Sequence, residues 1–517
     1  MDKRDFDVVV IGAGSAGCTL VNVLCQSERL SVCLVEAGPD YGPFDSGHWP
    51  EDLLDPRFDP MSHDWDYQAY RAEGSGFIDP RAKVVGGCSS HNDCAALWGL
   101  PDDYDSWAEA GNPGWGFEDL KPLIQRIEGV SPDSVTPYRG RNGALYTRRR
   151  PESELSIYQR FYLDACSEAG FPRVDDMSAP DPEEGVGSYH ANVKDSVRWN
   201  AAFAFLDPVR EHPNLTIMSD TMTDRLIIEG YKATGLICQT SNGALELRAE
   251  RFILCAGAYG SPSVLMRSGI GPPGHLRELN IPVLIDLQGV GRNLHDHPSF
   301  YIQFVPTPDA WRVVTEDLGS PDAYRGQVML RAKSPFCQGP FDLHIMPAQV
   351  NRTLESRTLE FFACNMAPLS RGEVLLRGED PGLPPRILTR YLTDPEDRDM
   401  SVLVYGLELI RRLAGKGPLA SVLAGESETW NSLRSENQIK DHLRRTVRNY
   451  SHAVGTCKMG PSVDPDAVVD SAGRVHGADN LYVADASIIP LIPRVNTNLT
   501  AMLIGMKVAD QLLASPV

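Results

Sequence analysis

The sequence lacks the features that mark membrane, metal-binding and disulfide-rich secreted proteins. No stretch reaches the roughly 18 uninterrupted apolar residues that a membrane-spanning helix needs. The 11 cysteines are scattered, without a CxxC pair or a Cys/His cluster at metal-ligand spacing. The N-terminus has no apolar core followed by a small-residue cleavage site. These absences predict a cytoplasmic protein with reduced thiols, no membrane span and no bound metal.

Positive charge is also scarce. The chain has 49 Lys and Arg against 69 Asp and Glu, a formal net charge of −20 at pH 7. Such a surface repels nucleic acids and anionic membranes, so neither is expected as a partner. With 42% hydrophobic and 23% charged residues, the composition is that of a globular protein, and 517 residues are enough for two domains.

The chain opens with a strand, a glycine-rich loop, a helix and a second strand. Residues 6–11 are apolar, as in a buried parallel strand, and Gly-Ala-Gly-Ser-Ala-Gly follows at 12–17. Glycines at these positions allow a tight turn, close approach to a pyrophosphate and close packing of helix on strand. A helix over 18–25 and a strand over 31–35 come next, and the following Glu36 is suited to accept ribose hydroxyls. The pattern predicts a dinucleotide site formed by Gly12, Gly14, Ser15, Ala16, Gly17, Glu36 and Ala37, without distinguishing FAD from NAD.

Further motifs distinguish the two cofactors. They are RAKVVGGCSSHN at 81–92, GAYGSPSVLMRSGIG at 257–271, GVGRNLHDHP at 289–298, SHAVGTCKMG at 451–460 and VADASIIP at 483–490. In this order, and with the N-terminal glycines, they resemble the glucose–methanol–choline (GMC) oxidoreductases over essentially the whole chain, most closely the choline oxidase branch. The resemblance implies FAD, a homodimer, and an α/β fold. In that fold a Rossmann-like FAD-binding domain is joined to an α+β substrate-binding domain, whose antiparallel sheet is backed by helices.

Both domains are predicted to be discontinuous, because the motifs are spread along the chain. The FAD-binding domain is expected to comprise residues 1–150, 194–300 and 448–517. The substrate-binding domain is expected to comprise residues 151–193 and 301–447.

The resemblance implies a reacting pair near the C-terminus. Oxidation of an alcohol by hydride transfer needs a base for the hydroxyl proton and a donor that stabilises the developing alkoxide. His452 is predicted to be the base and Asn496 its hydrogen-bonding partner, because their separation matches the His/Asn pair of choline oxidase-like enzymes. A purely structural histidine is the alternative, but the motif around His452 favours catalysis.

His91 is the predicted point of covalent attachment to the flavin, because choline oxidase has a flavin-linked histidine at this position. The alternative is a histidine that only hydrogen-bonds beside a non-covalent flavin. The remaining predicted FAD contacts are Gly86, Gly87, Ser90 and Asn92 near the ring, Thr223 at the adenine end, and Asp485, Ala486, Asn496 and Thr497 along the cofactor.

The predicted substrate pocket departs from that of choline oxidase. Val305 aligns with the glutamate that holds the trimethylammonium group there, and a neutral residue cannot pair with a cation. The sequence therefore predicts that choline is not the substrate, unless Asp93 supplies the missing charge. The other predicted pocket residues are His344, Tyr450 and Ser451.

The sequence thus predicts an FAD-dependent alcohol oxidase. The small-molecule alcohol would become an aldehyde or ketone, and O2 would be reduced to H2O2. Two alternatives stay open: a dehydrogenase of the same family that passes electrons to a quinone or a protein, and a lyase of the same fold that binds FAD without net redox chemistry.

Overall fold

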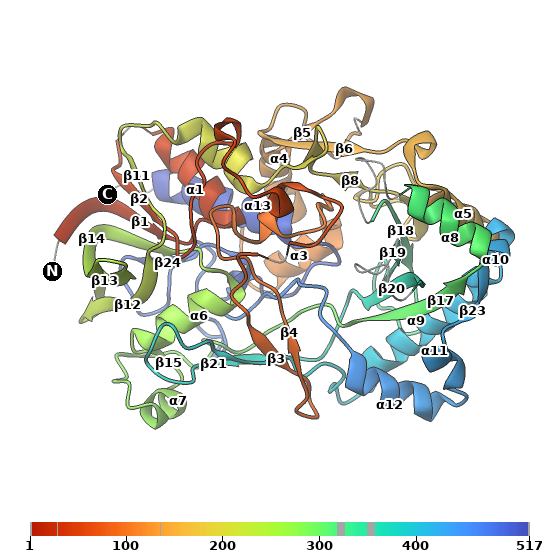
Figure 1. Cartoon of the computed structure of the whole chain (residues 1–517). Helices are drawn as coiled ribbons and strands as arrows, with labels where there is room; N and C mark the ends of the chain where they lie inside the picture. Colours follow the sequence, from red (N-terminus) through yellow and green to blue (C-terminus); the bar gives the residue numbers. More distant parts are fainter. Residues whose placement is uncertain are drawn as a thin grey trace.

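Two large β-sheets organise the chain (Figure 1). The computed structural model describes residues 3–514, apart from 28, 61, 135, 318–325 and 349–356. The α/β fold class predicted from the sequence is confirmed. Within the described residues, no helix combines the length and the apolar character needed to cross a bilayer.

The first sheet has seven strands and carries the N-terminal motif. Its strands are β1 (Lys3–Ile11), β2 (Val32–Val35), β11 (Leu215–Met218), β12 (Met222–Glu229), β13 (Lys232–Thr240), β14 (Gly243–Leu254) and β24 (Leu481–Val483). β1 lies between β2 and β14, and both pairings are parallel. Residues 8–11 of β1 and all of β2 are buried, which explains why these strands are almost purely apolar.

Helices α1 (Ser15–Cys25) and α13 (Asn498–Ala514) lie side by side against this sheet (Figure 1). A Cβ atom added at Gly505 of α13 would lie 2.3 Å from the carbonyl oxygen of Ala16 in α1. The two helices therefore cross almost backbone to backbone. Ser15 Oγ donates a hydrogen bond of 2.6 Å to Asn498 Oδ1, so their N-termini meet at one point.

The second sheet has six strands, all antiparallel, as the resemblance implied. Its order is β23 (Leu423–Glu426), β17 (Ser299–Pro306), β20 (Leu359–Asn365), β19 (Leu343–Ala348), β18 (Val328–Ala332) and β7 (Gly185–Ser188). Helices α5 (Ile157–Glu168) and α9 (Arg398–Ala414) share one hydrophobic core with it. Along β17, Phe300, Ile302 and Phe304 enter this core, because successive strand residues point to opposite faces.

Two small sheets join the segments assigned to the two domains. One contains β21 (Glu373–Leu375), β22 (Arg386–Leu388), β3 (Gln68–Tyr70) and β4 (Gly76–Ile78), and the other contains β5 (Glu128–Val130), β6 (Leu145–Arg149) and β8 (His190–Ala191). Each combines strands from both predicted domains, so the domain limits stay a prediction.

The remaining elements are short and connect the sheets. The helices are α2 (Glu51–Leu54), α3 (Pro101–Glu109), α4 (Phe117–Ile127), α6 (Gly257–Arg267), α7 (Pro273–Glu278), α8 (Pro308–Asp317), α10 (Gly417–Val422), α11 (Glu428–Ser432) and α12 (Glu436–Thr446). The strands form the pairs β9 (Val193–Lys194) with β10 (Val197–Arg198) and β15 (Ile270–Gly271) with β16 (Ile285–Asp286).

Two glycines dock the second motif onto the first. Gly87 has a left-handed φ of +54°, and a Cβ atom added to it would lie 2.6 Å from the Cα atom of Gly14. Only glycine therefore fits where the turn that leads to His91 meets the dinucleotide loop.

The substitution Gly87→Ala should lower stability more than Gly47→Ala does. Gly47 also has a left-handed φ, +70°, but a Cβ atom there meets nothing within 4 Å. Both variants add backbone strain of about 1 kcal/mol, whereas only Gly87→Ala adds a backbone clash, worth about 1–3 kcal/mol more. Thermal unfolding and the flavin content per polypeptide measure the difference. Equal losses in the two variants would contradict the proposed docking.

Candidate active site

The dinucleotide loop has the shape that a pyrophosphate requires. Gly12 has a φ of +107°, and a Cβ atom there would lie 2.4 Å from the carbonyl oxygen of Cys255. At Gly17 a Cβ atom would lie 2.0 Å from the carbonyl oxygen of Gly12. No side chain caps the N-terminus of α1, so backbone N–H groups there are available to an anion.

Glu36 lies at the predicted position, at the end of β2, and its carboxylate orders the loop. Its two oxygens accept hydrogen bonds of 2.9 Å from the backbone N–H groups of Ala13 and Gly38. Burial raises the pKa of Glu36 to about 7. A carboxylate has about four acceptor positions, so two are left for ribose hydroxyls.

The turn that carries His91 is held from several sides. Arg198, fully buried, donates to the carbonyl oxygens of Asp55 (2.7 Å) and Asn92. The side chain of Asn92 closes the turn, since its Oδ1 accepts the N–H of Cys94 (3.1 Å), and its contact with the flavin stays a prediction. Ser90 Oγ accepts a hydrogen bond from Asn200. Burial lowers the pKa of His91, so its imidazole is neutral at pH 7.

Three of the buried polar atoms that have no hydrogen-bond partner among the described residues lie in two segments predicted to contact FAD. They are His91 Nε2, Asn496 Oδ1 and Asn498 Nδ2. Unpaired buried polar atoms are rare in folded proteins and point to a bound group. Together with the glycine loop, these atoms fit a dinucleotide that extends from the α1 N-terminus to His91 and Asn496.

Other predicted FAD contacts have structural partners within the chain. Asp485 is buried, and its carboxylate accepts hydrogen bonds from Gly257 N (2.8 Å), Ser261 Oγ (2.6 Å) and Ser487 N (2.8 Å). It therefore joins α6 to the C-terminal segment, and its contact with FAD stays a prediction. Thr223 lies on β12 and its carbonyl accepts from Arg267. Ala486 and Thr497 lie beside these groups, and their contacts with FAD stay predictions.

The structure brings His452 and Asn496 together. Asn496 Nδ2 lies 3.1 Å from His452 Nε2, and His452 Nδ1 lies 2.9 Å from Nδ1 of His297. When Asn496 donates to His452 Nε2, the proton of the His452 ring is on Nδ1 and is donated to His297. In this tautomer Nε2 is the basic atom of His452.

A bulge presents His452. Two antiparallel bridges, His295 to Val454 and Ser299 to Arg448, join the segments on either side of the histidine pair. They enclose residues 296–298 on one side but residues 449–453 on the other. The two extra residues are accommodated by a left-handed φ of +63° at Ser451. Bulges of this kind redirect side chains and are common next to active sites.

Three buried histidines form the neutral centre of the site. Burial lowers the pKa of His452 and of His344 well below the ordinary value, and that of His297 to about 3. Nearby arginines add to the shift, Arg81 at His452 and Arg494 at His297. An uncharged imidazole at this position is able to accept a proton.

Aromatic side chains from the six-stranded sheet and from the bulge form the roof of the site. The ring of Tyr450 lies 4.1 Å from that of His452, centroid to centroid, and Phe362 lies 4.7 Å from Tyr450. Tyr301 of β17 packs 4.8 Å from Phe362 of β20. His344 of β19 stacks on Phe341 at 5.2 Å.

A group of charged residues lies beneath the bulge, and none of them was predicted from the sequence to belong to the active site. Asp296 Oδ1 accepts the backbone N–H groups of His297 (2.7 Å) and His452 (3.0 Å). Arg81 Nη1 donates to the Ser451 carbonyl (2.7 Å), and its Nη2 lies 3.1 Å from Asp79. Burial raises the pKa of Asp296 to about 7. The His-Asp-His-Pro motif was the available signal, since two histidines flank a carboxylate there.

Asp296, His297 and His452 also offer three potential metal-ligand atoms within 4.8 Å of one another. In this structure the ring nitrogens between the two histidines bond to each other, and Asp296 Oδ1 bonds to two backbone N–H groups. The three residues are therefore accounted for by hydrogen bonding.

The structure does not bring every predicted pocket residue to this cluster. Val305 is 45% exposed and pairs with Gly425 near the far end of β17. A strand advances about 3.3 Å per residue, which places Val305 about 20 Å along β17 from Ser299, beside the bulge. Its assignment to the pocket is therefore corrected. Ser451 and Asp93 are both exposed. Burial raises the pKa of Tyr450, and the charge of Asp93 makes a smaller contribution to this increase.

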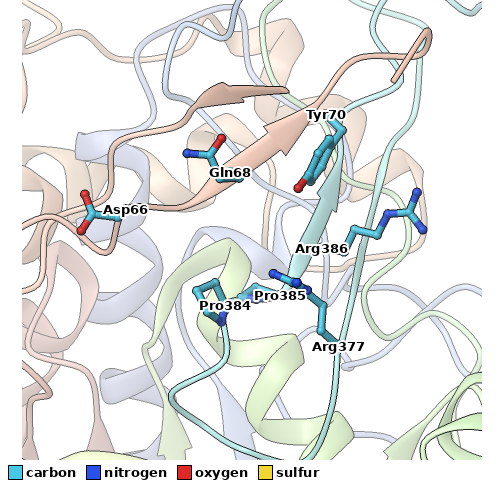
Figure 2. Close-up of a pocket in the computed structure, with 7 residues that line it drawn as sticks. All are labelled: Asp66, Gln68, Tyr70, Arg377, Pro384, Pro385 and Arg386. Atoms are coloured by element: carbon cyan, nitrogen blue, oxygen red, sulfur yellow. The ribbon is translucent and has the colours of Figure 1, made fainter. Parts of the chain in front are cut away.

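A separate surface pocket of about 330 Å³ lies on the outer side of the β3–β22 pair (Figure 2). Its lining residues are Asp66, Gln68, Tyr70, Arg377, Pro384, Pro385 and Arg386. None of them belongs to the histidine cluster or to the predicted FAD contacts.

Comparison with known proteins agrees with this architecture. The N-terminal domain of the GMC oxidoreductases matches residues 6–299, and their C-terminal domain matches residues 368–505. The chain belongs to the GMC oxidoreductase family, and it is an FAD-dependent enzyme that acts on CH–OH groups.

Individual relatives match along almost the whole chain. Choline oxidase from Arthrobacter globiformis is 34% identical, over 99% of this chain and 94% of its own. Oxygen-dependent choline dehydrogenase from Brucella anthropi is 31% identical, over 98% and 95%. The crystal structure of pyridoxine 4-oxidase from Mesorbium loti superposes with a TM-score of 0.87 at 28% identity, over 99% of this chain and 100% of the other.

Stability should fall in acid, because buried histidines resist protonation. A histidine whose pKa is lower in the folded state binds more protons when unfolded, so its contribution is complete above about pH 6.5 and is lost as the pH falls. Burial lowers the pKa of His190, outside the cluster, to about 3, which corresponds to a loss of about 2 kcal/mol at pH 5.

The variant His190→Gln isolates one such contribution. It should be less stable than wild type at pH 8, where it lacks the His190 contacts, and the gap should narrow by about 2 kcal/mol at pH 5. Urea unfolding at the two pH values measures both gaps. A gap that does not change with pH would contradict the assignment.

Proposed function

We propose that the chain is an alcohol oxidase in which His452 removes the hydroxyl proton while the carbon-bound hydride leaves for the flavin. Bound FAD would accept the hydride and pass the electrons to O2, which yields H2O2 and an aldehyde or ketone. The observation that carries the proposal is the 3.1 Å contact between Asn496 and a neutral, buried His452 under an aromatic roof.

Each member of the pair has a separate task. His452 Nε2 accepts the alcohol proton once the substrate oxygen replaces the Asn496 N–H at this atom, because the Nδ1–H of the ring is held by His297. The amide N–H of Asn496 donates to the substrate oxygen as its negative charge grows. Asn496 cannot compete for the proton at neutral pH, so within this pair we assign the base to His452 and the donor to Asn496.

Oxygen is proposed as the electron acceptor. The similarity to choline oxidase and to pyridoxine 4-oxidase supports this choice. The alternative is a dehydrogenase that passes electrons to a quinone or a protein. The similarity to an oxygen-dependent choline dehydrogenase is the observation that supports this alternative. Anaerobic reduction by an alcohol, followed by mixing with air or with a quinone, separates the two by which reoxidation is faster.

His91 is proposed to hold FAD covalently through Nε2. This atom is buried without a partner, and the pKa of the ring is lowered by burial, so its nucleophilic neutral form predominates at pH 7. After denaturation in acid, flavin should remain with the wild-type polypeptide and should be released from His91→Ala. Cys88→Ser, which removes the other nucleophile of the same turn, should retain it. Free flavin from the wild type would disprove the link.

The substrate is proposed to be a small uncharged alcohol with an aromatic or apolar group, rather than choline. The argument from Val305 no longer applies, because that residue lies away from the cluster. The surroundings of His452 give a different reason: the nearby carboxylates already lie next to an arginine, Asp79 and Asp296 beside Arg81. A permanent cation therefore finds no free counter-charge there, whereas a flat neutral ring packs against Tyr450 and Phe362.

A comparison of two alcohols tests the substrate class. Pyridine-3-methanol should reduce the flavin at least about tenfold faster than choline at equal concentration, because only the cation must be desolvated without a free counter-charge. Anaerobic stopped-flow absorbance measures the rates. Faster reduction by choline would refute the proposed class but not the assignment of the base.

The variant His452→Ala should slow flavin reduction by about 10²–10⁴-fold, the usual contribution of a positioned general base. Bound flavin should be unchanged. His190→Gln is the matched control, since it alters a buried histidine outside the cluster and should keep the wild-type rate. Near-normal reduction in His452→Ala would refute the role of the base.

A further inference from the structure

Asp296 lies between the two histidine segments, and one of its oxygens holds both of them. Oδ1 accepts the N–H of His297 at 2.7 Å and the N–H of His452 at 3.0 Å. The second N–H lies inside the bulge, where the bridged segments offer it no partner. The side chain of Asp296 therefore replaces a missing backbone acceptor next to His452.

Arg81 holds the same bulge from its other side. Its guanidinium donates to the carbonyl of Ser451 at 2.7 Å, directly before His452. Ser451 has a left-handed φ of +63°, which is strained for a residue other than glycine. A strained backbone persists only where its surroundings fix it, and here Arg81 and Asp296 do so at the C=O and the N–H of the same peptide group.

The carboxylate is also close to the ring that must become charged. A carboxylate oxygen of Asp296 and a ring nitrogen of His452 lie within 4.8 Å of each other. Asp296 is 4% exposed, and its Oδ2 has no hydrogen-bond partner among the described residues, with Arg81 Nη2 at 3.9 Å. The titratable and charged groups around it are Arg81, Asp79, Tyr259, Tyr391, Cys364, His297 and His452.

We propose that Asp296 is the counter-charge of His452 as well as the anchor of its backbone. The proposal rests on the proposed function of His452. When the O–H bond of the alcohol breaks, its proton binds to His452 Nε2 and the ring becomes an imidazolium. The hydride and its electron pair leave for the flavin. Above about pH 7, where Asp296 is ionised, its carboxylate then faces the new positive charge and stabilises it.

A purely structural role is the competing explanation, and the variant Asp296→Asn separates the two. An asparagine oxygen still accepts both backbone N–H groups, so the bulge is kept while the charge is removed. Loss of a carboxylate at this distance lowers the pKa of a histidine by about 1–3 units. The wild-type rate should fall below about pH 7, where Asp296 takes up a proton, and in Asp296→Asn this acid limb should move to lower pH. The rate on the alkaline plateau should fall by about 10–100-fold, because a weaker base abstracts the proton.

Asp176→Asn is the matched control. Asp176 is also 4% exposed, accepts a backbone N–H (Ser178, 2.9 Å) and lies beside an arginine and a histidine, Arg139 at 3.1 Å and His190 at 3.8 Å. It belongs to the separate network around Arg139. This variant should lower the melting temperature and leave the pH profile of flavin reduction at its wild-type position.

The experiment is anaerobic stopped-flow reduction of the holoenzyme from pH 5.5 to 10, together with thermal unfolding. A displaced acid limb and a lower plateau in Asp296→Asn alone would support the proposal. A wild-type profile in Asp296→Asn, with only the loss of stability seen in Asp176→Asn, would overturn it. If Asp296→Asn does not fold, Asp296→Glu tests the charge: a limb at the wild-type position supports the proposal, and a displaced limb overturns it.

Failure of the proposed function has a different signature. If the proposed function is wrong, no alcohol will reduce the flavin of the wild-type enzyme, or the variant His452→Ala will reduce its flavin at the normal rate. Neither result resembles an unshifted profile in Asp296→Asn.

Discussion

The candidate site depends on an unequal pairing of two chain segments. The bridges at His295–Val454 and Ser299–Arg448 enclose three residues on one side and five on the other. The surplus residues leave the plane of the pairing, and they carry Tyr450 into the aromatic roof and His452 towards Asn496 and His297. The bonds from Arg81 and Asp296 exist because a bulge leaves backbone groups without ladder partners. The aromatic roof, the position of His452 and the hydrogen bonds of the bulge with Arg81 and Asp296 thus follow from one difference in the number of residues between the two bridges.

Burial gives the same site its chemical character. Three imidazoles are enclosed and uncharged, at a cost in stability that increases in acid. The cost is connected with function, since an enclosed base is protected from water and its strength is set by a few fixed neighbours. His297 fixes the tautomer of His452, and Arg81 compensates the carboxylates that lie beneath the bulge.

Local sequence patterns predicted a large part of this arrangement. The glycine loop and Glu36 at the end of β2 each depend on neighbouring residues, so their sequences were sufficient. The proximity of His452 and Asn496 followed from the family resemblance. The roles of Arg81 and Asp296 did not, because they arise where three segments far apart in the sequence meet, and the register of the two bridges cannot be read from residue types. Val305 was misplaced for a related reason: alignment with a relative gave its position in the chain but not how far β17 carries it from the site.

The alternation of side chains along β17 and β20 has a consequence for how this enzyme can change. Tyr301 and Phe362 are paired across the two strands and face the site, while Phe300, Ile302, Phe361 and Ala363 face the hydrophobic core. Each strand therefore divides its residues between recognition of the substrate and stability of the domain. Mutations at the first set can reshape the pocket while the second set keeps the sheet folded. A fold with this division can acquire new alcohol substrates in single steps, which agrees with the different substrates named among its relatives.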